Sequence, residues 1–274
     1  MRKRHVRPVV CGLLILLSLC GAGPCRAFAA DSYPCSASRL SEGRTITDMA
    51  GRRVTVPCQI LRVATVGSVP VINSYLFALG QGEKIVNGLP YFARTKRWRL
   101  QIAVAPHLSG KPQLQGQDRA ISKEILHKIR PDVVLTMDAF AIRALKDSGI
   151  PVVFLEWRDL SEVRDNMRLL GNILSCTPMS DRYLRYFDGT MDRVRKVVKD
   201  VPEKLRPRAL FLDLNRFTTP LSIADWWITE AGGISVTAGT PRNENLTYSH
   251  EQVLLWNPDV LFVSSPDQIG KVYL

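Results

Sequence analysis

A short phrase that occurs twice is the feature of this sequence that most restricts its fold. The chain reads S-K-E-I-L-H-K-I-R-P-D-V-V-L-T over residues 122–136 and S-H-E-Q-V-L-L-W-N-P-D-V-L-F-V over residues 249–263. In both copies a glutamate stands seven residues before a Pro-Asp-Val triplet. The first copy reads as a serine-capped helix that ends before the proline and leads into an apolar strand buried on both faces. We therefore expect the same helix–strand unit in each of two lobes.

Helix and strand patterns alternate on both sides of one long amphipathic segment. A β-hairpin is expected over 45–57, and an apolar stripe at steps of three and four predicts a helix over about 178–201. The fold class predicted is α/β, with two Rossmann-like lobes joined by this long rigid helix. The expected divisions are an N-terminal lobe with a leading hairpin at 30–160, a connecting segment at 161–206 and a C-terminal lobe at 207–274.

Two further expectations concern local structure. Asn73 reads as the cap of a helix that stops at Gly80, and residues 89–117 read as an irregular, basic and aromatic stretch. After the second copy of the phrase, residues 264–274 are too few for the helix and strand that follow the first copy. We expect the C-terminal lobe to be truncated; an unusually small lobe is the alternative.

The first 29 residues have the pattern of a signal peptide. Four basic residues precede an apolar run from Val9 to Leu19, and A-F-A follows at 27–29. The run is too short to span a bilayer. Cleavage after Ala29 would lower the formal net charge from +12 to +7, a weak basis for nucleic-acid binding. Lipoprotein anchoring is the lesser alternative, because Leu19 and Pro24 precede the candidate cysteines where a small residue is needed.

Cleavage would leave three cysteines in an oxidising compartment. Cys35 and Cys58 could form a disulfide across the N-terminal hairpin, worth about 3 kcal/mol by loop-closure reasoning. Two unpaired thiols are the alternative. Cys176 is then the odd cysteine, and we expect it to be buried.

The sequence contains little that would support catalysis. It has no G-x-S-x-G or phosphate-binding loop, and G-Q-G-E-K-I at 80–85 follows a helix where a dinucleotide site follows a strand. His107, His127 and His250 lie too far apart in sequence for a histidine metal cluster. We expect no catalytic residues, no bound metal and no cofactor. Cations and aromatics cluster instead at residues 91–99. A second such segment, residues 215–220, directly follows the C-terminal end of a predicted strand, and ligands of open α/β sheets bind at such ends.

Several motifs appear together and in order: T-I-T-D-M-A-G-R-R-V-T-V-P, A-L-G-Q-G-E-K-I-V-N-G, E-I-L-H-K-I-R-P-D-V-V-L, G-I-P-V-V-F-L and N-P-D-V-L-F-V. From about residue 45 to residue 263 the chain resembles the periplasmic solute-binding proteins of ABC importers for ferric siderophores, cobalamin and haem, the class III group with a helical backbone. The resemblance implies a non-enzymatic, monomeric, periplasmic receptor that delivers its ligand to an ABC permease dimer in the inner membrane.

The resemblance also assigns roles to residues. It implies that Glu124 and Glu251, one on the rim of each lobe, pair with permease arginines; the simpler interpretation is a helix first-turn acid favoured by the helix dipole. By the same analogy the ligand contacts are expected from the facing loops of the two lobes. They are Tyr91, Arg94, Arg97, Arg99, Arg216, Phe217 and Trp227.

Basic, aromatic loops favour an anionic ferric chelate, such as an iron–siderophore complex. Cobalamin is the runner-up, haem belongs to the same group, and a metal oxyanion such as molybdate comes third. An enzyme acting on a metal chelate and a truncated product that does not transport remain as alternatives of other classes. The enzyme would need a nucleophile or a redox cofactor, and the sequence shows neither.

Overall fold

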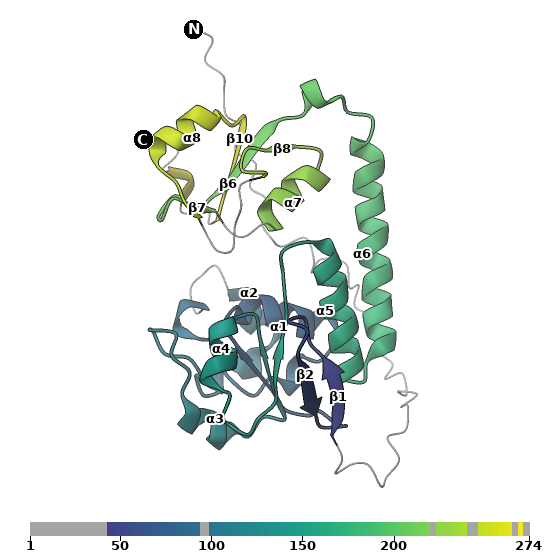
Figure 1. Ribbon diagram of the computed structural model, residues 1–274, viewed down its shortest axis with the longest axis vertical. Helices are drawn as coiled ribbons and strands as arrows, with labels where there is room; N and C mark the ends of the chain where they lie inside the picture. The colour runs from purple at the N-terminus through teal and green to yellow at the C-terminus, as the bar shows by residue number, and fades with distance from the viewer. Residues whose placement is uncertain (1–42, 94–98, 220–222, 240–245, 265–267, 271–274) are drawn as a thin grey trace. The chain divides into compact units, whose positions relative to one another are not determined.

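The computed structural model describes residues 43–93, 99–219, 223–239, 246–264 and 268–270 (Figure 1). These residues form two compact units, and the boundary falls between Phe187 and Asp188. The long helix α6 (Thr177–Val198) begins in the first unit and ends in the second. Among the residues described, no helix is both long and apolar enough to cross a membrane.

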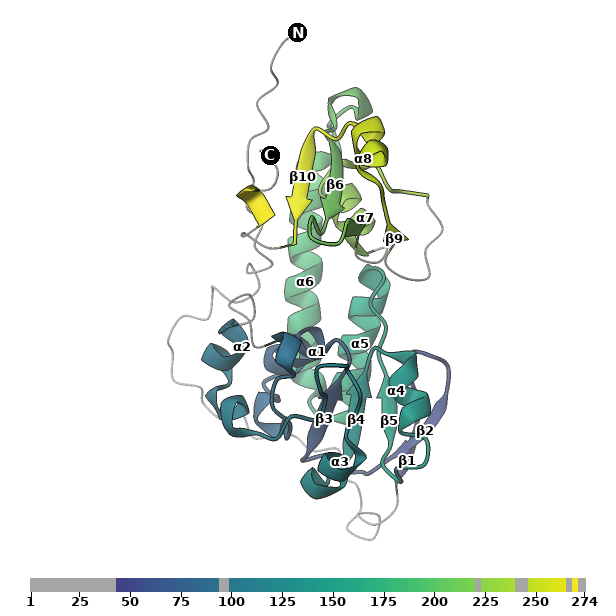
Figure 2. The same ribbon diagram turned by 90° about the vertical axis from the view of Figure 1, so that its left-hand side faces the viewer.

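The first unit begins with a hairpin and continues into a parallel sheet. Strands β1 (Arg44–Thr47) and β2 (Arg53–Val56) pair antiparallel, as the sequence predicts. Strands β3 (Val63–Val66), β4 (Val133–Thr136) and β5 (Val152–Phe154) follow in the order β3-β4-β5 and lie side by side in Figure 2. Every residue of these three strands is buried, because helices and loops cover both faces of a parallel sheet.

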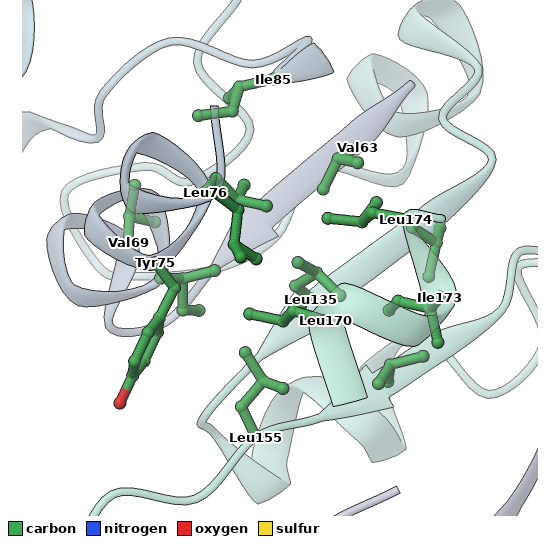
Figure 3. Close-up of a cluster of buried hydrophobic side chains, with 14 of the residues drawn as sticks. Val63, Val69, Tyr75, Leu76, Ile85, Leu135, Leu155, Leu170, Ile173 and Leu174 are labelled. Atoms are coloured by element: carbon green, nitrogen blue, oxygen red, sulfur yellow. The ribbon is translucent and has the colours of Figure 1, made fainter. Parts of the chain in front are cut away.

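Helices of the first unit alternate with its strands. They are α1 (Val69–Ala78), α2 (Arg99–Val104), α3 (Lys123–Ile129), α4 (Ala139–Ala144) and α5 (Leu160–Ile173), with 3-10 turns η2 (Gly82–Lys84), η3 (Tyr91–Ala93) and η5 (Pro106–Gly110). The core between them is shown in Figure 3, where Leu76 of α1 and Leu170 of α5 lie among side chains of β3 and β4. Leu76 and Leu170 are both fully buried, and burying one leucine side chain contributes about 1.5–3 kcal/mol to the stability of the fold.

The second unit repeats the same plan with fewer elements described. Strands β6 (Arg208–Leu212), β8 (Ile234–Ser235) and β10 (Val260–Val263) form a parallel sheet in the order β10-β6-β8. The other elements are α7 (Ile223–Glu230), α8 (His250–Trp256), the turn η6 (Glu203–Leu205) and the antiparallel pair β7 (Thr218–Thr219) and β9 (Leu246–Thr247). Two parallel sheets and a long helix confirm the predicted α/β fold class.

Two local predictions need correction, and one helix was not predicted. Asn73 is not a helix cap: α1 begins after Ser68, and Asn73 lies buried inside it, where its side-chain oxygen accepts a hydrogen bond from Thr65 Oγ1 at 3.0 Å. The stretch 89–117 is not irregular throughout, since it contains η3, α2 and η5. Helix α5 was not predicted, although Asp159 caps it and its buried residues recur at helical spacing.

Helices α5 and α6 approach closely where a glycine permits it. A Cβ atom on Gly171 would lie 2.5 Å from Cβ of Ser180, nearer than van der Waals contact allows. The hydroxyl of Ser180 donates to the carbonyl of Met167 at 2.7 Å, which satisfies the buried oxygen at this crossing. The start of α6 is therefore held against the first unit by backbone proximity as well as by side-chain packing.

Candidate functional site

The repeated phrase folds into the same helix and the same cap in both units. The hydroxyls of Ser122 and Ser249 each accept a hydrogen bond from the backbone N–H three residues on, at 3.2 Å and 3.1 Å. Each helix ends at a residue in the left-handed region, Arg130 with φ 42° and Asn257 with φ 43°. The serine cap that the sequence predicts at Ser122 is therefore confirmed, and Ser249 caps the second helix in the same way.

The shared aspartate has a structural role that the sequence did not reveal. The carboxylate of Asp132 accepts hydrogen bonds from the backbone N–H groups of Leu61 and Arg62 at 2.7 Å and 2.8 Å, just before β3. The carboxylate of Asp259 accepts from the N–H of Arg208 at 3.0 Å, at the start of β6. In both units the aspartate N–H donates back to the carbonyl of that arginine at 2.8 Å. Each Pro-Asp therefore fixes the register of its sheet.

The two glutamates of the phrase occupy equivalent exposed positions. Glu124 is the second residue of α3 and Glu251 the second residue of α8. The pKa of Glu251 lies below its ordinary value, mainly because its own backbone N–H and the Ser249 hydroxyl hydrogen-bond to the carboxylate. Glu251 is therefore charged at neutral pH. The permease-docking role of both glutamates stays a prediction.

The predicted ligand residues of the first unit lie around η3 and α2. Tyr91 begins η3 and is 60% exposed, and Arg99 begins α2 with an exposed side chain. Arg94 and Arg97 lie outside the described residues. Tyr91 and Arg99 are thus both accessible to a solute, and their ligand contacts stay a prediction.

The structure adds a cation to this region that sequence reasoning missed. The guanidinium carbon of Arg119 lies 5.4 Å from the centroid of the Phe92 ring, a cation–π distance. Gln115 connects this arginine to the sheet: its Oε1 accepts from the N–H of Gly67 at 2.8 Å, and its Nε2 donates to the carbonyl of Arg119 at 3.2 Å. Gly67 directly follows β3, so Arg119 is held near the carboxyl end of that strand.

The carboxyl end of β4 carries an exposed aromatic ring. Asp138 follows the strand and caps α4 by accepting from the N–H of Phe140 at 2.8 Å. Phe140 itself is 60% exposed, and the Arg143 guanidinium lies 5.8 Å from its ring centroid. An exposed aromatic ring and a cation thus follow β4, and Arg119 is held near the end of the neighbouring strand β3.

In the second unit the predicted loop is organised around Asp213, the residue after β6. Its carboxylate accepts from the backbone N–H groups of Asn215 and Arg216 at 2.9 Å and 3.2 Å. Ser264 Oγ and Gln268 Nε2 donate to the same carboxylate at 2.9 Å and 3.2 Å. Burial raises the pKa of Asp213, but these hydrogen bonds outweigh burial and hold the pKa below its ordinary value. A charged Asp213 thus shapes the turn that presents Arg216.

The aromatic residues of this unit fall into two environments. Phe217, which has φ 51°, lies against the His250 ring with 3.9 Å between centroids, whereas the adjacent Arg216 is exposed. Trp227 is half-buried and packs edge-on against Phe211 of β6, with 5.9 Å between centroids. Packing against Phe211 buries part of the Trp227 ring, and the predicted contact of Trp227 with a ligand stays a prediction.

The cysteine predictions have different outcomes. Cys176 is half-buried beside Lys84, and burial raises the pKa of its thiol to about 11. Cys58 is half-buried shortly after β2, but Cys35 lies outside the described residues, so their disulfide stays a prediction. In the part of the chain described, no three His, Cys, Asp or Glu side chains gather as metal ligands would.

Several solved structures share the fold of this chain. The molybdate periplasmic binding protein MolA of Haemophilus influenzae is 22% identical, with a TM-score of 0.71, 84% of this chain covered and 77% of that chain. A protein of the ABC-type Fe3+-hydroxamate transport system of Saccharomonospora viridis is 21% identical, with a TM-score of 0.66 and 85% of each chain covered.

The third structure is the periplasmic vitamin B12 binding protein BtuF of Vibrio cholerae. It is 17% identical, with a TM-score of 0.60, 78% of this chain covered and 80% of that chain. At these identities the likeness establishes the fold and leaves the ligand open. None of the curated proteins matches the sequence. A family described as periplasmic binding protein matches residues 75–272, which is most of the chain.

Proposed function

We propose a function from one premise: this chain belongs to the periplasmic binding protein family. It is the extracytoplasmic solute-binding component of an ABC importer, and it delivers its solute to the membrane permease dimer without chemical turnover. The observation that carries this proposal is the match over 75–272 together with the folded repeat, which places an exposed glutamate at the same position of α3 and α8. The signal-peptide pattern of residues 1–29 supports an exported, periplasmic protein.

We propose an anionic metal chelate of the iron–siderophore type as the solute. In the first unit the Arg119 guanidinium lies over the Phe92 ring, and in the second Arg216 is exposed and directly precedes Phe217 in the sequence. A guanidinium next to an aromatic ring suits a ligand that carries both negative oxygens and flat apolar groups. A ferric catecholate or carboxylate complex has both.

Cobalamin is the second candidate, and a specific observation supports it. Tyr91 on η3 and Phe140 after β4 are each 60% exposed, and a corrin ring needs apolar contact more than charge. Haem would use the same contacts, and a small metal oxyanion would use the cations without the rings.

The test is a tryptophan-fluorescence titration of residues 30–274, confirmed by calorimetry because several of these ligands absorb light. The panel is ferric catecholate, hydroxamate and carboxylate siderophores, cobalamin, haem and molybdate. We expect saturable binding of one class, with the ligand recovered unchanged. Chemical conversion of the ligand would refute the proposal of a receptor without turnover.

Charge-neutralising variants test whether the loop arginines Arg119 and Arg216 contact the ligand. Replacing Arg119 or Arg216 by Gln should weaken an anionic chelate about tenfold or more, because each change removes a charge-assisted hydrogen bond. Arg168→Gln is the matched control, since Arg168 is an exposed cation on α5 that pairs with Asp165 at 2.8 Å. Cobalamin binding that both loop variants leave unchanged would favour the second candidate.

The docking part of the proposal has a separate test. In a Glu124→Arg, Glu251→Arg double variant the association with the importer should be lost, because a like charge replaces each acid at the rim. Both side chains are exposed, so ligand affinity should not change. Unfolding should become slightly easier, because each arginine replaces a first-turn acid that the helix dipole favours. Unchanged association would remove the docking role of these residues.

A further inference from the structure

The exposed faces of α3 and α8 match position by position. In each helix the first, second, fifth and sixth residues are exposed, and the other three residues are less exposed. The second position is glutamate in both, at Glu124 and Glu251. The two helices therefore present faces of the same size and register to the outside of their units.

The chemistry of the two faces differs at the fifth and sixth positions. On α3 these are His127 and Lys128, which is ordinary for a solvated surface helix. On α8 they are Leu254 and Leu255, whose exposed fractions are 76% and 78%. Because they lie three and four residues after Glu251, the leucines and the carboxylate share one side of the helix.

The exposure of these leucines is not required by the packing of α8. The residues of α8 that face inward are Gln252, Val253 and Trp256, and Trp256 packs edge-on against Tyr248 with 4.6 Å between ring centroids. In Figures 1 and 2, α8 lies on the outside of its unit. Leu254 and Leu255 form an exposed apolar patch next to a polar residue, and exposed apolar patches rimmed by polar residues mark surfaces that bind a partner.

We propose that Glu251, Leu254 and Leu255 form an amphipathic docking face, and that its occupant is the membrane-spanning subunit of the importer. That subunit would provide a cation for Glu251 and an apolar surface for the two leucines. The inference rests on the proposed function, but it goes beyond it: the two rims dock by different chemistry. The α3 rim is polar throughout, whereas the α8 rim adds apolar contact. On a permease made of two different subunits, unequal rims would select one of the two docking orientations.

Site-specific photo-crosslinking in the producing cells tests which partner covers this face. A photoreactive benzoylphenylalanine replaces Leu255, and the matched control carries it at Val197, which is 76% exposed on α6. We expect a crosslink from position 255 to an integral membrane subunit of an ABC importer and none from position 197. A crosslink from 255 to a second copy of this chain, no crosslink, or equal crosslinking from both positions would overturn the proposal.

Replacing the two leucines by the residues at the same positions of α3 measures what they contribute to permease affinity. In Leu254→His, Leu255→Lys the α8 face acquires the residues of the α3 face. Since leucines buried in an interface each contribute to its stability, we expect the affinity for the crosslinked subunit, in detergent, to fall about tenfold or more. Thermal unfolding and ligand affinity should not change, because both leucines are exposed.

The outcomes separate the two proposals. If the wild-type protein binds the importer and the exchanged variant binds equally well, the apolar docking face is wrong and the importer function stands. If the wild-type protein binds a solute but no importer subunit, both the importer function and this docking face are overturned. A variant weakened only at high salt would also contradict the inference, because apolar contact is insensitive to ionic screening.

Discussion

Replacing Asp213 should weaken the second unit and release its candidate ligand loop. The carboxylate receives four hydrogen bonds, from two backbone N–H groups and from the side chains of Ser264 and Gln268. Asp213→Ala removes all four acceptor contacts of a half-buried group. At about 0.5–1 kcal/mol for each, the free energy of unfolding should fall by about 2–4 kcal/mol. Asp213→Asn keeps an oxygen for the backbone N–H groups and should lose about half as much.

The effect should depend on pH in one direction. The folded-state pKa of Asp213 lies below the ordinary value of 3.8, so its ionised form stabilises the folded protein. This contribution is fully present above about pH 4 and disappears as the pH falls through the folded-state pKa. The difference in stability between wild type and Asp213→Asn should therefore be largest at neutral pH and shrink below pH 4.

Urea unfolding followed by tryptophan fluorescence measures these differences, since Trp226, Trp227 and Trp256 all belong to the second unit. Asp200→Ala, an exposed aspartate just after α6, is the control. A loss for Asp213→Ala no larger than for Asp200→Ala would refute the reasoning. So would a difference between wild type and Asp213→Asn that grows as the pH falls.

Three further predictions concern the first unit. Gly171→Ala should lower the free energy of unfolding by about 1–3 kcal/mol, because the new Cβ would overlap Ser180; a neutral effect in calorimetry would contradict the close helix crossing. Asp132→Ala should cost about 1–3 kcal/mol in urea unfolding by freeing two backbone N–H groups, and Asp132→Asn should cost less; equal losses would show that the oxygen acceptor is not what matters. Cys176, with a pKa raised to about 11, should react slowly with iodoacetamide at pH 8 in the folded protein and faster only as the pH approaches 11; fast reaction at pH 8 would contradict its burial.

Local signals in the sequence predicted those elements whose ends are fixed by neighbouring residues. Helix α3 has the predicted bounds because Ser122 caps its start and Pro131 prevents its continuation. Helix α6 was predicted from the spacing of apolar residues along one face, and its observed bounds are Thr177–Val198. The position of Asn73 was misread because a helix-capping residue type here satisfies a buried hydrogen bond to Thr65 instead.

The candidate site was less predictable because tertiary contacts organise it. Arg119 stands alone in the sequence, and its position depends on Gln115, which reaches the strand end at Gly67. Asp213 likewise joins residues that are up to 55 positions apart, such as Gln268. No spacing rule identifies such contacts. The candidate residues Tyr91, Arg99 and Arg216 were, by contrast, chosen from local sequence, a cluster of cations and aromatics at 91–99 and a strand end before 215–220, and their ligand contacts stay a prediction.

The hydrogen bonds of Asp132 and Asp259 to the first strand of each sheet also affect the order in which the chain can fold. Each joins the first strand of its sheet to a neighbour far along the sequence, 70 residues away for Arg62 and Asp132 and 51 for Arg208 and Asp259. Parallel pairing of this kind closes a long loop before it gains contacts, which slows folding. Each sheet must therefore wait for the second strand of its pair to be synthesised. Until then the strands of that sheet stay unpaired and exposed, and an incomplete chain with unpaired strand edges is prone to aggregation.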